Sequence, residues 1–227
     1  MIFDPYVWFK PDWIIHCCHA AARHYSVSNK KPSSELAKLI SEAQTTALFC
    51  FGFNLLYHKE HRMQLVNPDE QSPDTRVMYE VPQENGNKAL EYYDIEVVEK
   101  IEKDTTPEGI ADFILRTKFA KDKSYDNKTT ILCGIYKNIE AESAKAINEH
   151  LLNAGVKEHS VFILGAVDDN TYRLLRVAPT IDHDIVFDML VEAKKPYIND
   201  SRVLFGANSY RRPKTQKNGI LNPFMDS

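Results

Sequence analysis

Residues 72–100 read SPDTRVMYEVPQENGNKALEYYDIEVVEK, and they contain the hairpin on which the fold prediction rests. The run 76–81 is predicted to form a strand, and the polar residues 84–87 have the composition of a turn. A second strand is predicted over 89–101, where Tyr, Ile and Val alternate with acidic residues. The stretch is therefore predicted to be a β-hairpin.

Two acidic residues, Asp94 and Glu96, lie on the second predicted strand of this hairpin. Side chains alternate along a strand, so Asp94 and Glu96 are expected on one face, with Val98 next along it. Two neighbouring carboxylates on an otherwise apolar strand repel each other and resist burial. A divalent cation would remove both penalties, and a third acid, Asp74, lies just upstream.

This arrangement resembles the PD-(D/E)XK nuclease superfamily, whose signature is an acid after proline, a hairpin, and an acid-x-lysine triplet on the next strand. Pro73-Asp74 supplies the first part. With Asp94 as the second acid, Glu96 stands in the lysine position; with Glu96 as the second acid, Val98 stands there. The superfamily accommodates both patterns, because a glutamate can replace the lysine or the lysine can migrate to the following helix.

The resemblance implies a site and a function. The function is hydrolysis of DNA phosphodiester bonds, as in restriction, repair or phage defence, by an endonuclease that uses Mg²⁺ with Mn²⁺ as a substitute. The implied metal ligands are Asp74, Asp94, Glu96 and Glu42. The implied catalytic residues are Asp74, Asp94, Glu96, Lys118 and Lys121. The alternative is a nuclease fold without chemistry that serves as a nucleic-acid- or protein-binding module, and the missing motif lysine favours it.

The elements around the hairpin follow the order that the superfamily would require. A helix is predicted to begin at Ser33 or Ser34, with Glu42 beside its apolar stripe. A second helix is predicted over 110–123 after a capping signal at 104–108, and a buried strand over 129–136. The resemblance thus covers an α-β-β-β-α-β core within a mixed α/β sheet flanked by helices.

The sequence beyond the hairpin region completes the predicted division of the chain. Residues 1–32 are predicted to be an N-terminal helical extension, and 33–200 the nuclease-like core. Later elements of that core are a helix over 141–154, strands over 161–167 and 172–177, and a helix from Asp182 to Lys195. Residues 201–227 are predicted to be a basic C-terminal tail.

The tail carries the candidate nucleic-acid contacts. Residues 201–219 contain no acid, and their basic residues are suited to follow a phosphate backbone or to serve as a solubility element. The predicted contacts are Arg211, Arg212, Lys214 and Lys217. The expected partner is DNA, RNA is not excluded, and a homodimer is a further possibility that the sequence leaves open.

Composition narrows the class of protein. The chain has 227 residues, 43% hydrophobic and 26% charged, which is typical of a globular protein. Its formal net charge of -4 argues against an extensively basic surface but allows a local basic groove. The four cysteines show no disulfide framework and no apolar run is long enough to span a bilayer, so we expect a cytoplasmic protein without a membrane anchor.

Overall fold

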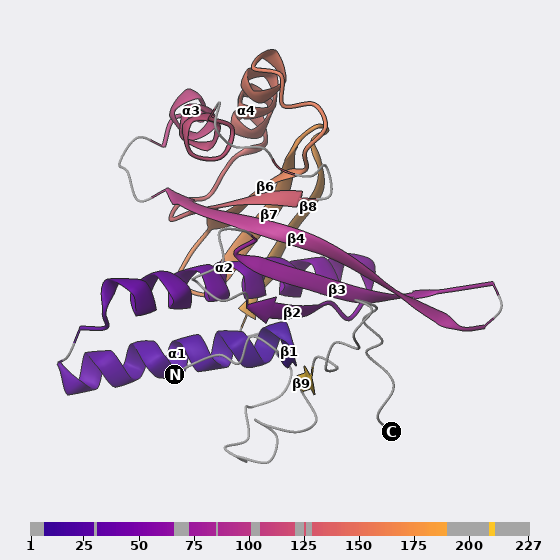
Figure 1. Ribbon diagram of the computed structural model, residues 1–227. Coiled ribbons are helices and arrows are strands. Elements are labelled where there is room, and N and C mark those ends of the chain that lie inside the picture. Colours follow the sequence, from indigo (N-terminus) through magenta and orange to yellow (C-terminus); the bar gives the residue numbers. More distant parts are fainter. Residues whose placement is uncertain are drawn as a thin grey trace.

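The computed structural model describes most of the chain, and the statements below concern these residues: 7–29, 31–65, 73–84, 86–100, 105–120, 125, 129–189 and the backbone of 209–211. They form a nine-stranded mixed sheet with helices on both faces (Figure 1). The strand order is β8-β7-β6-β5-β4-β3-β2-β1-β9. The prediction of a mixed α/β sheet flanked by helices is therefore confirmed.

The middle of the sheet contains the predicted hairpin. Strands β2 (Arg62–Leu65), β3 (Thr75–Pro82) and β4 (Lys88–Lys100) form an antiparallel meander. Helix α3 (Pro107–Lys118) then crosses over to β5 (Thr129–Ile135), which is parallel to β4. The long hairpin formed by β3 and β4 extends beyond the helical layers (Figure 1).

The second half of the chain extends the sheet. Helix α4 (Ala141–Asn153) connects β5 to the parallel strand β6 (Val161–Ala166), and β7 (Thr171–Ala178) returns antiparallel to β6. Every residue of β5 is buried, as expected for a central strand covered on both faces.

One predicted helix is wrong. Instead of a helix from Asp182, the structure has strand β8 (Asp182–Asp188), paired with β7. Val186 is exposed while Phe187 is buried, which is the alternation of a strand. Acids in this strand also pair with arginines of β7, which stabilises the ladder.

Short strands complete the opposite edge. Strand β1 (Val7–Phe9) pairs with β2, and the backbone of β9 (Ser209–Arg211) pairs with β1. All pairings at this edge are antiparallel. Part of the segment predicted as a basic tail therefore continues the sheet.

Two long helices cover one face. Helices α1 (Pro11–Ser28) and α2 (Ser34–Tyr57) lie side by side, on the opposite side of the sheet from α3 and α4 (Figure 1). Ser33 caps α2, as predicted, by accepting a hydrogen bond from the backbone N–H of Leu36 at 3.2 Å. Within the described residues, no helix is long and apolar enough to cross a membrane.

Each face of the sheet has its own hydrophobic core. Alternation along β4 directs Ile95 and Val97 into the core under α1 and α2, and Val98 into the core under α3 and α4. Acidic residues of β4 alternate with these apolar ones, and Glu96 lies between Ile95 and Val97. The fold therefore brings the acids of β4 close to both cores.

Candidate functional site

The site begins at Asp74, immediately before β3. The β3–β4 ladder pairs Thr75 with Ile95, so the next pair in register would set Asp74 across from Glu96. The carboxylate of Asp74 accepts a hydrogen bond from the backbone N–H of Val97 at 2.8 Å. This bond directs the Asp74 side chain toward β4.

Lys118, the last residue of α3, joins the two acids. Its Nζ lies 2.9 Å from Glu96 Oε2 and 3.5 Å from Asp74 Oδ2. The side chains of Lys118 and Glu96 are only 8% and 7% exposed, so this ammonium and this carboxylate are largely withdrawn from water. Such a buried charge is tolerated only when a partner neutralises it. The crossover helix thus delivers a lysine to the acids of the hairpin.

Glu42 approaches from the other helical layer. Its Oε1 forms an ion pair with Nζ of Lys38, one helical turn earlier, at 3.4 Å. The hydroxyls of Thr46 and Thr75 lie 3.4 Å apart and bring this part of α2 to the start of β3. Burial, and then the negative charge of Asp74, raise the pKa of Glu42 to about 7.

The pKa of Asp74 is also raised, first by burial and in part by the charge of Glu96. The ammonium of Lys118 and the N–H of Val97 act in the opposite direction. The charge of Asp74 thus acts on Glu42 and the charge of Glu96 acts on Asp74, with lysines close by. Such convergence of like charges has an electrostatic cost, and it is typical of functional sites.

Asp94 does not join this group. Its Oδ1 is 3.0 Å from Nε of Arg76, its direct cross-strand neighbour on β3. Both side chains are about one-third exposed, at 38% and 32%. Asp94 thus forms a cross-strand ion pair with Arg76. It is the neighbour of Glu96 on the same face of β4.

The remaining predicted residues are placed only in part. Lys121 lies outside the described residues, so Lys118 is the candidate lysine that the structure positions. The backbone of Arg211 lies in β9, and its side chain is outside what the structure describes. Arg212, Lys214 and Lys217 are likewise outside the described residues.

Sequence reasoning missed two contributors. Lys38 could have been found from its spacing of four residues before Glu42 on a helix. Arg76 could have been found only from the hairpin register, which sets it opposite Asp94. The hydrogen bond from the Val97 backbone could not be predicted from the sequence, because any residue except proline can donate its backbone N–H.

The donor atoms of these acids determine whether they could hold a metal ion. Among the described residues, no group of three His, Cys, Asp or Glu side chains is arranged to hold one. Mg²⁺, however, is commonly bound by one or two carboxylates together with waters and substrate phosphates. Asp74 and Glu96 offer hard oxygen ligands and already share one cation, the ammonium of Lys118. The pair therefore suits Mg²⁺ in donor chemistry, and a metal ion there would share the carboxylates with Lys118.

Comparisons with models of known protein families, with curated proteins and with solved structures gave no match. The function must therefore be argued from the site.

Proposed function

We propose that this protein is a metal-dependent nuclease that hydrolyses DNA phosphodiester bonds. The observation that carries the proposal is the ammonium of Lys118 held between Asp74 and Glu96. In the proposal these residues correspond to the acid, acid and lysine of the PD-(D/E)XK signature, with the lysine supplied from the following helix. Glu96 is then the second acid, and Asp94 is its neighbour in an ion pair.

The order of elements supports the same proposal. From α2 to β5 the chain runs helix, three antiparallel strands, helix, and a parallel strand. This is the α-β-β-β-α-β order of a restriction-endonuclease-like core. Asp74 precedes one strand of the hairpin and Glu96 lies within the next, which is consistent with this proposal.

Each residue has a role in the proposal. Asp74 and Glu96 would hold Mg²⁺, or Mn²⁺ in its place. The metal, when bound, lowers the pKa of a water molecule and neutralises charge on the phosphate. Lys118 Nζ, a donor already directed at the acids, would donate to an oxygen of the scissile phosphate. The carboxyl of Glu42, with a pKa of about 7, is suited to accept a proton from the attacking water.

Cleavage assays with variants test the proposal. Wild-type protein with Mg²⁺ or Mn²⁺ should cut at least one of single-stranded, duplex, branched or supercoiled DNA, and chelation should abolish this. Asp74→Asn, Glu96→Gln and Lys118→Met should each lower the rate by about a hundredfold or more. Asp94→Asn, on the same strand, is the matched control and should stay within a few-fold of wild type.

Two outcomes of these cleavage assays would contradict the proposal or its assignment of residues. If folded wild-type protein cuts none of these substrates, the proposal fails and the alternative of a nuclease-like binding module is favoured. If Asp94→Asn loses as much activity as Glu96→Gln, the assignment of the second acid to Glu96 is wrong.

A further inference from the structure

A pocket lies on the face of the sheet covered by α2. It has a volume of about 230 Å³, and it is lined by the C-terminal half of α2 together with β3, β4 and the starts of β5 and β6. Half of the residues that line it are phenylalanine or tyrosine, and none of the described residues that line it is an acid. Its aromatic residues are Phe49, Phe53, Tyr57, Tyr79, Tyr93 and Phe162. We name this cavity the aromatic pocket.

The rings of the aromatic pocket are fixed by contacts with one another. Phe53 stacks on Phe49 at a centroid distance of 4.9 Å and meets Phe162 edge-on at 5.5 Å. The imidazole of His183 lies nearly parallel to Phe162, at 6.1 Å and 27°. Preorganised ring faces of this kind stack on flat heterocycles, whatever their identity.

The polar groups of the aromatic pocket include the hydroxyl of Tyr93. The Tyr93 hydroxyl is buried, and it has no hydrogen-bond partner among the described residues. An unmatched buried hydroxyl costs free energy, and a hydrogen-bond partner that reached it from the pocket would remove that cost. A ligand with a polar edge would satisfy this group.

His61 also lines the aromatic pocket, and the protonation of its ring can be assigned. Its backbone N–H donates to Asn54 Oδ1 at 2.7 Å, and its Nδ1 lies 2.6 Å from the same oxygen. Because that oxygen accepts, Nδ1 carries the proton. Burial and the charge of Lys59 lower the pKa of His61 to about 4, so the ring is neutral at pH 7 and Nε2 is an acceptor.

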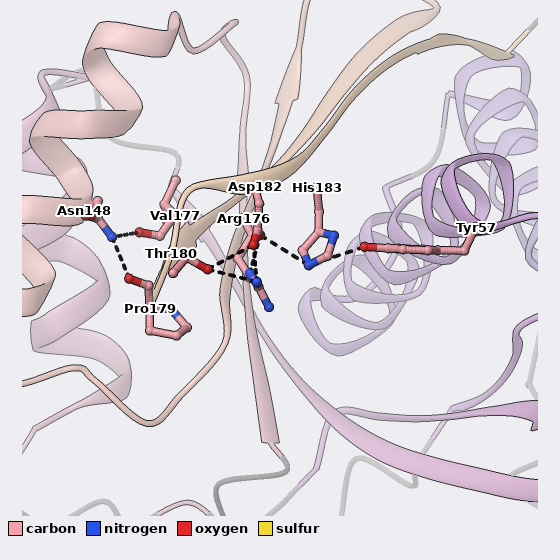
Figure 2. Close-up of polar contacts among 8 residues, drawn as sticks. All are labelled: Tyr57, Asn148, Arg176, Val177, Pro179, Thr180, Asp182 and His183. Atoms are coloured by element: carbon pink, nitrogen blue, oxygen red, sulfur yellow. Dashed lines mark hydrogen bonds and ion pairs between the residues drawn. The ribbon is translucent and has the colours of Figure 1, made fainter.

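A polar network fixes the wall formed by β7 and β8. His183 Nε2 lies 3.3 Å from the Tyr57 hydroxyl and 3.2 Å from Asp182, whose carboxylate also binds Arg176 (Figure 2). Asn148 of α4 donates to the backbone carbonyls of Val177, near the end of β7, and of Pro179, just after it (Figure 2). The wall is thus held in place before any ligand arrives.

The charges at the aromatic pocket favour an anion. Lys59 is exposed and lies 4.4 Å from the ring centroid of Tyr79, whereas Arg176, which also lines the pocket, is already paired with Asp182. A purely cationic ligand, which aromatic cages otherwise bind, would be repelled by Lys59. A flat heterocycle with an attached phosphate matches the rings and the charges together.

We propose that the aromatic pocket binds one nucleotide, with the base against the rings and the Tyr93 hydroxyl, and the phosphate at Lys59. The nucleotide can be a free mononucleotide or one unit of a single strand, since both present the same chemistry. The site is separate from the acids. Phe53 and Glu42 are about 16 Å apart along α2, at a rise of about 1.5 Å per residue.

Calorimetric titration in EDTA tests this inference independently of cleavage. The probes are the four deoxynucleoside 5′-monophosphates and a short single-stranded oligonucleotide, intact or with one abasic site. At least one probe should bind with a Kd below about 1 mM. Binding of monophosphates identifies a free nucleotide as the source, whereas binding of the intact oligonucleotide alone identifies a strand. Asp74→Asn should bind as wild type does, even if it cannot cleave.

Variants decide whether binding occurs in the aromatic pocket. Tyr93→Phe should weaken binding about five- to tenfold by removing one hydrogen bond, while melting no lower than wild type because the hydroxyl has no partner there. Lys59→Ala should weaken binding of the monophosphate but not of its nucleoside, and Lys157→Ala, an exposed control, should change neither. Absence of binding by every probe, or binding that is insensitive to both Tyr93→Phe and Lys59→Ala, would overturn the inference.

Discussion

At the scale of single residues, the candidate site depends on one buried charge. The ammonium of Lys118 is offset by Asp74 and Glu96, and each of these groups would be costly to bury alone. The sequence indicated Lys118 because it lies one turn beyond Ile114 on the buried side of its helix. It could not distinguish Glu96 from Asp94, because that choice depends on the cross-strand partner, Arg76.

Removing the Lys118 ammonium should destabilise the protein. We expect Lys118→Met, in EDTA at pH 8, to lower the free energy of unfolding by about 3 kcal/mol, because two carboxylates lose their counter-ion. Denaturant titration measures this change. Lys38→Met is the control: Lys38 is 73% exposed, so its loss should change stability by less than about 1 kcal/mol. Equal effects for both variants would contradict the structure.

Glu42 should make stability depend on pH. Its pKa is raised from 4.5 to about 7, so between these values the folded protein holds a proton that the unfolded chain has released. Stability is therefore lost as pH rises through this window. Glu42→Gln should raise the free energy of unfolding at pH 8 by about 2–3 kcal/mol and leave it unchanged at pH 4. The exposed control Glu149→Gln should change the free energy of unfolding by less than about 0.5 kcal/mol.

At the scale of secondary structure, the site is assembled by the hairpin and the helix that follows it. The hairpin, the crossover helix α3 and the central strand β5 could all be predicted, because turn residues, capping signals and buried β-branched runs mark them locally. Strand β8 could not, since its DHD start resembles a helix cap and its pairing with β7 depends on residues distant in sequence. Tertiary pairing overrode local propensity there.

The cap of α3 offers a test at this scale. Thr106 Oγ1 accepts a hydrogen bond from the backbone N–H of Gly109 at 3.1 Å. Thr106→Ala should therefore lower the free energy of unfolding by about 1 kcal/mol. Thr106→Ser keeps the acceptor and should lose much less, as measured by thermal or denaturant unfolding. If the two variants are equally unstable, the cap does not stabilise α3.

At the scale of the whole molecule, the candidate site uses residues from both helical layers and from the hairpin between them. Glu42 comes from the α2 layer and Lys118 from the α3 layer, and β3 and β4 lie between them (Figure 1). The fold class was predictable from the alternation of helices and strands. The pairing of β9 with β1 was not, because no local pattern shows that residues from the two ends of the chain meet.

The C-terminal basic residues give a prediction about DNA binding by the full chain. If Arg211, Arg212, Lys214 and Lys217 bind phosphates, replacing all four with alanine should flatten the dependence of log affinity on log salt. On duplex DNA the slope should change by about 0.9 for each phosphate that the variant no longer neutralises. Binding measured over a range of salt concentrations checks this. An unchanged slope would assign these residues to another role.

Thermal unfolding with and without Mn²⁺ tests the central claim, that Asp74 and Glu96 hold a metal ion, without any substrate. At about 100 times its dissociation constant, a ligand stabilises the folded state by about 2.7 kcal/mol, which should raise the Tm of wild type by about 5–10 °C. Asp74→Asn should lose this shift while melting no lower without metal, because an amide oxygen can still accept from Val97. Asp94→Asn should keep it. If Mn²⁺ leaves wild type unchanged, or raises the Tm of Asp74→Asn equally, these acids are not a metal site.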